Sequence, residues 1–448
     1  MNCETVVKFG RSETAFPYLE KTAKMLLEQP EQKVIVLSPP GGHNGQVGVI
    51  DLLQKYFNGN YQQASRGQRN IAFSLLEDIV RSSSAALGVP DYQKDLTTAI
   101  TLLDNPKTSN WGIEEAGCLV PSLVARKIGA QVLKPTEFLQ FDQDQNVDPA
   151  SYELAASRID KLQGRVVIPG FFGRSFDGRI RIMNTSDTAA AVLARGLGAK
   201  SLDVWTWHEG IYAANPSLYS SGVNRDKPVV IPELTYAELA ELGERGMGAI
   251  DPASLRHLDP KVTQVHIRNI SDSLGKGTII TRFREATNKT DIVGLASDGP
   301  YTPFVINMAG MEDVVGVGAS IAEAFGFLGI PYQRGTSGKG YGRYYVSDKF
   351  IKESTTGHGA IEDCILNAVP GFEKSVKVEP EVGLLSVVGQ GMKDRSSYYI
   401  GRLMSWLDEA ELRQVQVLDN TSLSFSFTVP FGELTRATRT LHDRFFRD

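Results

Sequence analysis

The sequence is poor in the residues that mark several common classes of protein. Its 448 residues include only three cysteines, at positions 3, 118 and 364, an odd number without the spacing of a disulfide framework. The six histidines are scattered without metal-ligand spacing, so we predict no metal site built by the protein. The net charge is −5 and no run of Lys and Arg stands out, which argues against a nucleic-acid partner. The cysteine pattern indicates a protein of a reducing compartment.

Long apolar runs are absent as well. The most apolar segment, residues 314–330, contains Glu323 and several glycines and is too short to span a bilayer. Residues 1–10 lack the basic and apolar regions of a signal peptide. With 42% hydrophobic and 22% charged residues, the composition is that of a soluble protein. We therefore expect a cytoplasmic protein without a membrane partner, divided into two or three domains.

The most informative stretch is residues 167–216. An apolar run ends in the sequence Gly-Phe-Phe-Gly at 170–173, and residues 185–188 then open an alanine-rich helix. A strand, a glycine turn and a helix start together present backbone N–H groups to an anion. A helix N-cap explains Ser186 or Asp187 equally well, because their side-chain oxygens satisfy the first N–H groups of a helix. The stretch alone leaves both interpretations open.

Strand and helix patterns alternate over nearly three hundred residues. Helices are predicted at 62–103, 114–128 and 236–245, and prolines and glycines at 38–42 force a loop. This alternation predicts a mainly parallel sheet covered by helices on both faces. The predicted strands are residues 5–10, 33–37, 166–169, 203–207, 229–232 and 264–268.

The pattern changes from about residue 288. Short strands are predicted at 291–296, 304–308 and 341–346, with a helix at 314–327, and the same order returns further on. The result is a weak repeat of β-α-β-β units around 304–372 and 381–446. Such a repeat suggests a regulatory tail, and a structural dimerisation module has the same pattern. The second set comprises a strand at 384–388, a helix at 399–410 and a strand at 423–429.

Several familiar motifs fail on inspection. The sequence Gly-Thr-Ser-Gly-Lys-Gly at 335–340 lacks the hydroxyl residue after the lysine and the spacing of a phosphate-binding loop. The glycine pairs at 316–318 and 389–391 lack the third glycine of a dinucleotide fingerprint, and tight turns explain them better. No serine lies in a nucleophile elbow.

The combined pattern resembles the aspartokinases of the amino-acid kinase fold along nearly the whole chain. The tail resembles paired ACT domains. The resemblance implies an amino-acid-kinase-like catalytic domain at 1–285 and paired ACT domains at 286–448, for regulation and dimerisation. The first ACT unit is expected at 301–372, and the second from 291–298 plus 378–448. The matching segments are residues 6–10, 37–42, 170–173, 186–190, 205–216, 234–239, 267–269, 277–280, 388–392 and 441–446.

The family chemistry implied by this resemblance is transfer of the ATP γ-phosphoryl group to the β-carboxylate of aspartate, with Mg²⁺ carried by the nucleotide. The resemblance also implies a homodimer formed through the ACT domains. It assigns Glu115 to the substrate ammonium, although Glu114 fits the register equally well. The implied site residues are Lys8 and Asp187 for catalysis, Ser38, Glu115, Phe171 and Ser186 for the substrate, and Gly10, Gly41, Gly42, Thr206 and Tyr212 for the nucleotide.

The sequence departs from the family pattern at five positions. Arg11 replaces a glycine that admits phosphate, and Met183-Asn184-Thr185 replaces the arginine-glycine-glycine that precedes Ser-Asp. Arg179 and Arg181 are the candidates to replace the missing arginine. Each lost cation weakens transition-state stabilisation by a few kcal/mol. The departures are Arg11, Met183, Trp207 in place of an aspartate, Ser217 in place of an arginine and Gly248 in place of a lysine.

Three hypotheses therefore stand. The first is an active kinase acting on aspartate or on another small carboxylate or amino acid. The second is a weak or inactive aspartokinase paralogue that senses a ligand or regulates a true aspartokinase. The third is a kinase-fold enzyme recruited to specialised metabolism. The glycine-rich residues 334–342 lack the serine-and-acid pattern of feedback-inhibited relatives, so an ACT-mediated dimer is predicted rather than lysine or threonine inhibition.

Overall fold

The computed structural model divides the chain into two compact units, each with its own sheet. Unit 1 comprises residues 1–211, 232–236 and 249–284, and unit 2 comprises 212–231, 237–248 and 285–448. Several positions discussed above, among them Gly42, residues 183–185 and Gly248, lie outside the described residues. The structure describes residues 4–15, 18–41, 48–57, 65–182, 186–219, 227–247, 250–272, 274–285, 287, 291–308, 315–338, 340–353, 357–368 and 374–447.

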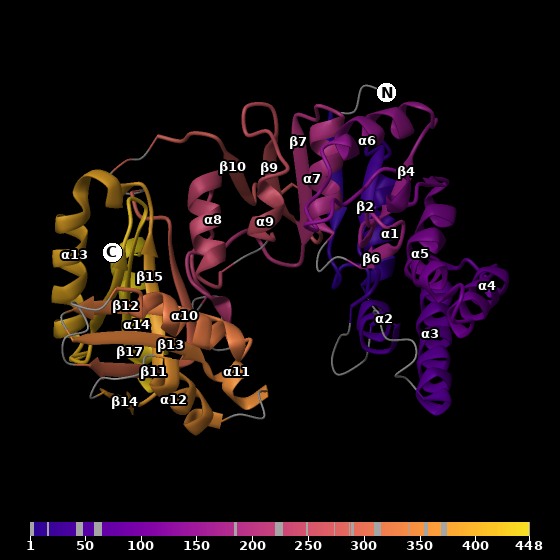
Figure 1. Ribbon diagram of the computed structural model, residues 1–448. Coiled ribbons are helices and arrows are strands. Elements are labelled where there is room, and N and C mark those ends of the chain that lie inside the picture. The colour runs from indigo at the N-terminus through magenta and orange to yellow at the C-terminus, as the bar shows by residue number, and fades with distance from the viewer. Residues whose placement is uncertain are drawn as a thin grey trace. The chain divides into compact units, whose positions relative to one another are not determined.

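Unit 1 is built on an eight-stranded sheet of order β3-β4-β2-β1-β7-β9-β10-β8 (Figure 1). Neighbouring strands are parallel except for the antiparallel pair β9 and β10. The central strands are short apolar runs, as expected of parallel strands covered on both faces. The strands are β1 (Thr5–Phe9), β2 (Val34–Leu37), β3 (Gln131–Val132), β4 (Val166–Pro169), β7 (Ser201–Thr206), β8 (Glu233–Thr235), β9 (Gln264–Asn269) and β10 (Thr278–Thr281), with a hairpin of β5 (Phe172–Arg174) and β6 (Ile180–Ile182).

Helices cover both faces of this sheet. Alternate side chains of β1 and β2, among them Val7, Phe9 and Ile35, join a core with α1 to α5. Helix α7 packs against β1 and β7, and α6 packs against α7, so the opposite face is covered too. The helices are α1 (Leu19–Glu28), α2 (Val49–Phe57), α3 (Arg66–Leu87), α4 (Gln93–Asp104), α5 (Ser109–Ile128), α6 (Ala150–Asp160), α7 (Asp187–Gly196) and α9 (Pro252–Leu255).

Two predicted boundaries in this part of the chain are wrong. Helix α5 begins at Ser109 rather than at residue 114, because Gly112 lets it approach the backbone of Leu103 on α4. The predicted strand at 229–232 is absent, and β8 begins after Pro232, whose nitrogen carries no N–H for a ladder. The first correction places Glu114 and Glu115 inside a helix and not in its first turn.

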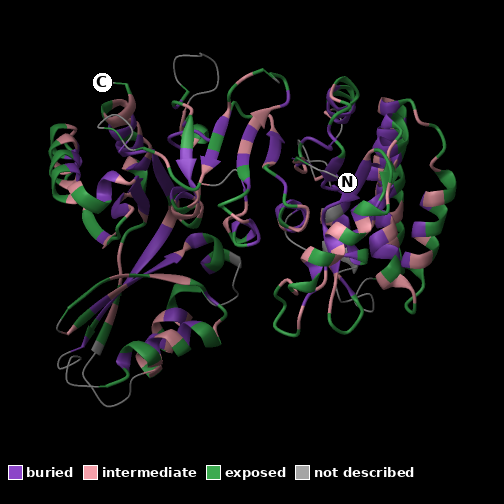
Figure 2. Ribbon diagram, turned by 90° about the horizontal axis from the view of Figure 1, so that it is seen from above, coloured by how far each residue is buried: buried purple, intermediate pink, exposed green. Residues whose placement is uncertain are grey.

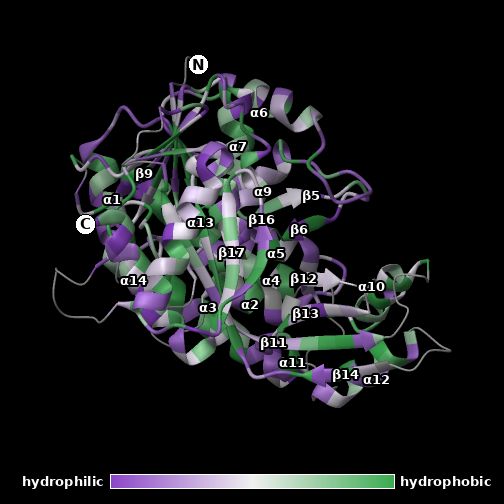
Figure 3. Ribbon diagram, turned by 90° about the vertical axis from the view of Figure 1, so that its left-hand side faces the viewer, coloured by the Kyte–Doolittle hydropathy of each residue, from purple (hydrophilic) through white to green (hydrophobic). Residues whose placement is uncertain are grey.

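Unit 2 is organised by one long strand, β11 (Gly294–Met308), which is hydrophobic along much of its length (Figure 3). Its first half pairs with β15, and its second half pairs with β13 and β14. The two strands predicted at 291–296 and 304–308 are therefore one continuous strand. The other strands are β12 (Tyr332–Gly338), β13 (Tyr341–Ser347), β14 (Lys374–Val378), β15 (Val382–Val388), β16 (Gln416–Asn420) and β17 (Ser424–Pro430).

Residues of β11 take part in two hydrophobic cores that are formed with helices. Leu295 belongs to a core with α13 and α14, whereas Phe304 and Ile306 belong to another with α10 and α12. Figure 2 shows the strands largely buried and the helices exposing one side. The fold class predicted from the sequence, a mainly parallel α/β sheet followed by α+β ACT-like units, is confirmed. The helices of unit 2 are α8 (Tyr236–Glu244, with Tyr236 itself in unit 1), α10 (Val317–Phe327), α11 (Asp348–Glu353), α12 (Gly357–Ala368), α13 (Gly391–Glu409) and α14 (Leu434–Phe446).

In the part of the chain that the structure describes, no helix has both the length and the hydropathy that a membrane span requires.

Candidate functional site

Four parallel strands of unit 1 end together at one edge of the sheet. Phe9 on β1 pairs in register with Leu37 on β2 and with Trp205 on β7, and Leu37 pairs with Pro169 on β4. The segments that follow these strands therefore meet at the carboxyl edge. Ligands of open α/β sheets bind at this edge. Most of the predicted site residues lie here.

Lys8 and Asp187 form a buried ion pair at this edge. Lys8 lies near the end of β1, and Asp187 is the first residue of α7. Lys8 Nζ lies 2.5 Å from Asp187 Oδ1, and both side chains are less than 10% exposed. The backbone N–H of Asp251 donates to Asp187 Oδ2 at 2.9 Å, which fixes the carboxylate from a second side. The two predicted catalytic residues are thus in direct contact.

Ser38 and Ser186 lie next to this pair. Ser38 follows β2, Ser186 precedes α7, and their hydroxyl oxygens are 2.6 Å apart. Gly170 makes the approach of α7 feasible, because a Cβ there would lie 2.3 Å from Val36 Cγ1 and 2.9 Å from Ser186 Cβ. The structure therefore brings two of the four predicted substrate residues together.

Two predicted nucleotide residues, Gly10 and Gly41, surround Arg11. A Cβ at Gly10 would lie 2.6 Å from Glu13 Oε2, and a Cβ at Gly41 would lie 2.8 Å from Arg11 Cβ. The guanidinium of Arg11 lies over the ring of Phe171, a third predicted substrate residue. Packing therefore requires a glycine at position 41, because Arg11 Cβ cannot move away without the backbone, whereas at position 10 only the end of the flexible Glu13 side chain would have to shift.

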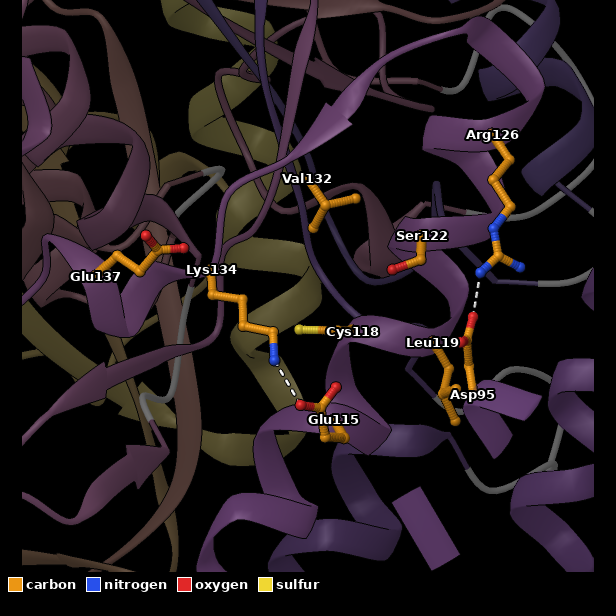
Figure 4. A pocket seen from close by; sticks show the side chains of 9 residues that line it. All are labelled: Asp95, Glu115, Cys118, Leu119, Ser122, Arg126, Val132, Lys134 and Glu137. Carbon is orange, nitrogen blue, oxygen red and sulfur yellow. Dashed lines mark hydrogen bonds and ion pairs between the residues drawn. The ribbon is translucent and has the colours of Figure 1, made fainter. Parts of the chain in front are cut away.

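Glu115 lies apart from the other predicted substrate residues, in a separate cavity on α5 (Figure 4). Its Oε1 lies 2.5 Å from Lys134 Nζ, so its carboxylate is already paired with a cation. The cavity has a volume of about 290 Å³. It is lined by Asp95, Glu115, Cys118, Leu119, Ser122, Arg126, Val132, Lys134 and Glu137.

Glu114, the residue before it, lies on another side of α5. It is 3% exposed and accepts a hydrogen bond from the hydroxyl of Thr136. Burial raises the pKa of the Glu114 carboxyl above its ordinary value. Gly117, one helical turn further, packs against the ring of Phe172, so this side of the helix faces the segment after β4. Of the two alternatives that the sequence left open, Glu114 is the buried one.

The remaining nucleotide residues are divided between the two units. Thr206 ends β7 in unit 1, and its hydroxyl accepts a hydrogen bond from the His208 N–H at 3.4 Å. Tyr212 belongs to unit 2 and forms an isolated bridge with Val230. The rings of Trp207 and Tyr18 have centroids 4.5 Å apart, and the ammonium of Lys21 lies over the Trp207 ring, 5.3 Å from its centroid. An aromatic packing contact occupies the position where the family pattern has an aspartate.

Sequence reasoning missed one contact at the site and proposed two arginines that are occupied elsewhere. The Asp251 N–H bond to Asp187 was not foreseen, although Asp251-Pro252 is a recognisable helix start, with Asp251 Oδ1 capping Ala253. Neither candidate for the missing arginine lies free at the site. Arg179 pairs with Asp177, and Arg181 donates to the carbonyl of Gln145 and lies over Phe141.

A family model matches the part of the chain that contains most of unit 1. The model of the amino acid kinase family matches residues 18–269, more than half of the chain. This match covers Ser38, Gly41, Glu115, Phe171, Ser186, Asp187, Thr206 and Tyr212.

Two curated relatives match the chain along its whole length. Aspartokinase 3 of Bacillus subtilis is 26% identical, over 98% of this chain and 98% of that protein. Lysine-sensitive aspartokinase 3 of Escherichia coli is 24% identical, over 98% of this chain and 99% of that protein.

Solved structures agree in fold. Aspartate kinase from Clostridium acetobutylicum has a TM-score of 0.83 at 20% identity, covering 98% of this chain and 100% of that one. Aspartokinase III from E. coli, in complex with aspartate and ADP, has a TM-score of 0.72 at 20% identity, covering 99% of each chain. The aspartokinase resemblance predicted from the sequence is thus confirmed, and the chain belongs to the amino acid kinase family.

Proposed function

We propose that this protein transfers the γ-phosphoryl group of ATP to the β-carboxylate of L-aspartate, giving an acyl phosphate. The observation that carries the proposal is the buried Lys8–Asp187 pair at the start of α7, beside the Ser38 and Ser186 hydroxyls. Similarity to aspartokinases along the whole chain supports aspartate as the acceptor.

Phosphoryl transfer depends mainly on positioning and on cancelling negative charge. Lys8 supplies an ammonium at the carboxyl edge, where phosphates of the nucleotide and the acceptor must meet. Asp187 holds that ammonium in place and is itself held by the Asp251 N–H. The N-terminus of α7 adds the positive end of a helix dipole at the same place. Both charged residues therefore have a role in stabilising the transition state.

The acceptor would lie against Ser38, Ser186 and Phe171. The two hydroxyls can donate to a carboxylate, and the fully buried Phe171 ring provides an apolar wall. For the substrate ammonium we propose Glu114 ahead of the originally predicted Glu115. Glu114 is buried on the side of α5 that faces Phe172, whereas Glu115 is paired with Lys134.

The nucleotide would use the loops at Gly10 and Gly41, with Thr206 as a further predicted contact in unit 1. The nucleotide role of Tyr212, which belongs to unit 2, stays a prediction from the sequence. Glycine backbones admit phosphates closely, and the adjoining Lys8 offers a charge to them. Among the residues that the structure describes, no group of three or more His, Cys, Asp and Glu side chains forms a metal site. The carboxylate of Asp187 at this edge is an oxygen ligand of the kind that Mg²⁺ prefers, and one such carboxylate suits Mg²⁺ that arrives with ATP and is held mainly by phosphates. Asp187 would lie beside the nucleotide phosphates, and Mg²⁺ would further neutralise their negative charge.

The direct test uses purified protein with Mg·ATP and a panel of amino acids and small carboxylates, with hydroxylamine to trap an acyl phosphate. The proposal predicts a hydroxamate with L-aspartate and a lower yield with the other acceptors. A hydroxamate with a different acceptor would correct the substrate. No hydroxamate with any acceptor, together with no ATP binding by calorimetry, would refute the kinase function and favour an inactive paralogue.

We further propose a cytoplasmic homodimer formed through unit 2. The ACT-like arrangement of its strands and helices supports this assembly, since such units commonly associate in the family that the chain resembles. Light scattering on the full chain, compared with a chain ending at residue 285, tests the role of residues 286–448, which make up most of unit 2. A dimer of the truncated chain would place the interface elsewhere.

A further inference from the structure

Arg11 locks together the loops that follow β1 and β2. It stands directly after Gly10, and its carbonyl accepts a hydrogen bond from the Gly41 N–H at 3.2 Å. The aliphatic part of its side chain packs on Gly41, where an added Cβ would lie 2.8 Å from Arg11 Cβ and 3.3 Å from Arg11 Cδ. The side chain therefore has a defined course across the carboxyl edge of the sheet.

The guanidinium at the end of this side chain reaches the acceptor side of the edge. Arg11 Cζ lies 5.8 Å from the centroid of the Phe171 ring, within the range of a cation–π contact. Phe171 follows Gly170, which itself contacts Ser186. The guanidinium of Arg11 thus lies against Phe171, and the neighbouring Gly170 contacts Ser186, whose hydroxyl is beside that of Ser38.

The guanidinium has unused hydrogen-bonding capacity. Its Nε–H is enclosed without a hydrogen-bond partner, and within the described part of the chain no carboxylate forms an ion pair with Arg11. A buried donor without an acceptor is unfavourable. The arginines of the neighbouring hairpin are occupied: Arg174 and Arg181 donate to backbone carbonyls, and Arg179 pairs with Asp177.

We propose that Arg11 binds, through its guanidinium, the carboxylate of the acceptor that is not phosphorylated. This inference rests on the proposed kinase function and assigns a substrate-binding residue to it. The family arginine that precedes Ser-Asp is absent from this sequence, and Arg11 supplies the missing guanidinium from the loop after β1. The arginine at position 11 then provides a cation that the family pattern has before Ser-Asp, and its effect is more than an obstruction to phosphate. The acceptor must accordingly carry two carboxylates, one held by Arg11 and one phosphorylated.

Steady-state kinetics of Arg11→Gln and Arg11→Lys test this assignment. We expect Arg11→Gln to raise the KM for aspartate by about 10- to 100-fold, because a charge-assisted bidentate contact is lost. The KM for ATP should stay within about twofold, and Arg11→Lys should be only partly active because an ammonium lacks the planar fork. Arg195→Gln is the matched control, since Arg195 also lies over an aromatic ring, that of Tyr152, and is expected to leave both constants unchanged.

An altered acceptor separates binding from packing. The wild type should use the α-amide of aspartate much less well than aspartate itself, because the amide lacks the charge that Arg11 binds. In Arg11→Gln the guanidinium is already absent, so this variant should prefer aspartate over the α-amide much less strongly. Equal discrimination by both proteins, or an Arg11→Gln variant with unchanged KM for aspartate, would overturn the inference while leaving the kinase function intact. A variant that changes only the KM for ATP would place Arg11 on the nucleotide and would also overturn it.

If the wild type makes no acyl phosphate, calorimetry still measures whether Arg11 binds a carboxylate. In that case the kinase function fails, and binding of L-aspartate to the wild type and to Arg11→Gln is measured directly. Binding that is lost in the variant supports the carboxylate site. No difference between the two proteins, or no binding to either, refutes it. Thermal unfolding of each variant shows whether the fold has survived.

Discussion

The ammonium of Lys8 and the carboxylate of Asp187 lie 2.5 Å apart, although one belongs to the first strand and the other to the seventh helix. The pair is almost fully buried, so each charge depends on the other for its solvation. Removing one partner from such a pair leaves an unpaired buried charge, which is far less favourable than removing both.

Lys8→Met and Asp187→Leu should therefore each destabilise the protein by about 3 to 5 kcal/mol and reduce turnover by orders of magnitude. The double variant Lys8→Met/Asp187→Leu should recover most of the stability but none of the activity. Urea unfolding and the hydroxamate assay measure the two properties separately. Catalysis by the double variant at a wild-type rate would show that the pair is only structural.

The aspartokinase resemblance assigned Lys8, Ser38 and Asp187 to the site, and the parallel sheet gives the physical reason why they lie together. The carboxyl ends of β1 and β2 and the start of α7 must meet once the strands pair in parallel. Arg11 is different, because its side chain crosses from one loop to the ring of Phe171, and no local pattern encodes that course. From the sequence, Arg11 could therefore be recognised only as a departure from the family's glycine.

Glu114 and Glu115 show a second limit. The one-residue step between them rotates the side chain by about 100° around the helix, which separates a buried position from the side cavity. Their place in the chain depends on where α5 begins, and that depends on Gly112 packing on α4. Such a tertiary contact is not visible in the hydrophobic pattern. The same reasoning applies to the Asp251 N–H bond, which joins two distant segments of unit 1.

Gly117 is predicted to be intolerant of any side chain. A Cβ at this position would lie 1.8 Å from Phe172 Cζ, and the ring is itself fully buried. We expect Gly117→Ala to lower the stability of the protein by about 1 to 3 kcal/mol because the core is overpacked. Gly401→Ala on α13 is the control, since an added Cβ there meets no atom within 4 Å and alanine favours a helix. Thermal unfolding compares the two, and equal melting temperatures would contradict the packing.

His257 should make the stability of unit 1 sensitive to acid. Burial, with smaller effects from Arg256 and Arg195, lowers the pKa of this histidine to about 4, and its Nδ1 lies 3.1 Å from the Tyr152 hydroxyl. The unfolded chain takes up the proton near pH 6.5, before the folded protein does. Stability is thus present above that pH and is lost as the pH falls toward 4, by on the order of 3 kcal/mol. His257→Gln should flatten the unfolding free energy between pH 6.5 and 4. An unchanged pH profile would show that the imidazole is not the group responsible.

Replacement by glutamine should affect the protein at Glu114 and have little effect at Glu115. Burial raises the pKa of Glu114, so its contribution favours folding at low pH and is lost as the pH rises through the folded-state value. Glu114→Gln should therefore raise the melting temperature at pH 8 more than at pH 4, and should raise the KM for aspartate if the carboxylate receives the substrate ammonium. Glu115→Gln removes only a half-exposed pair with Lys134 and should change stability by less than about 1 kcal/mol, with an unchanged KM. A variant at 115 that raises the KM while the one at 114 does not would restore Glu115 as the substrate residue and place the acceptor ammonium at the cavity on α5.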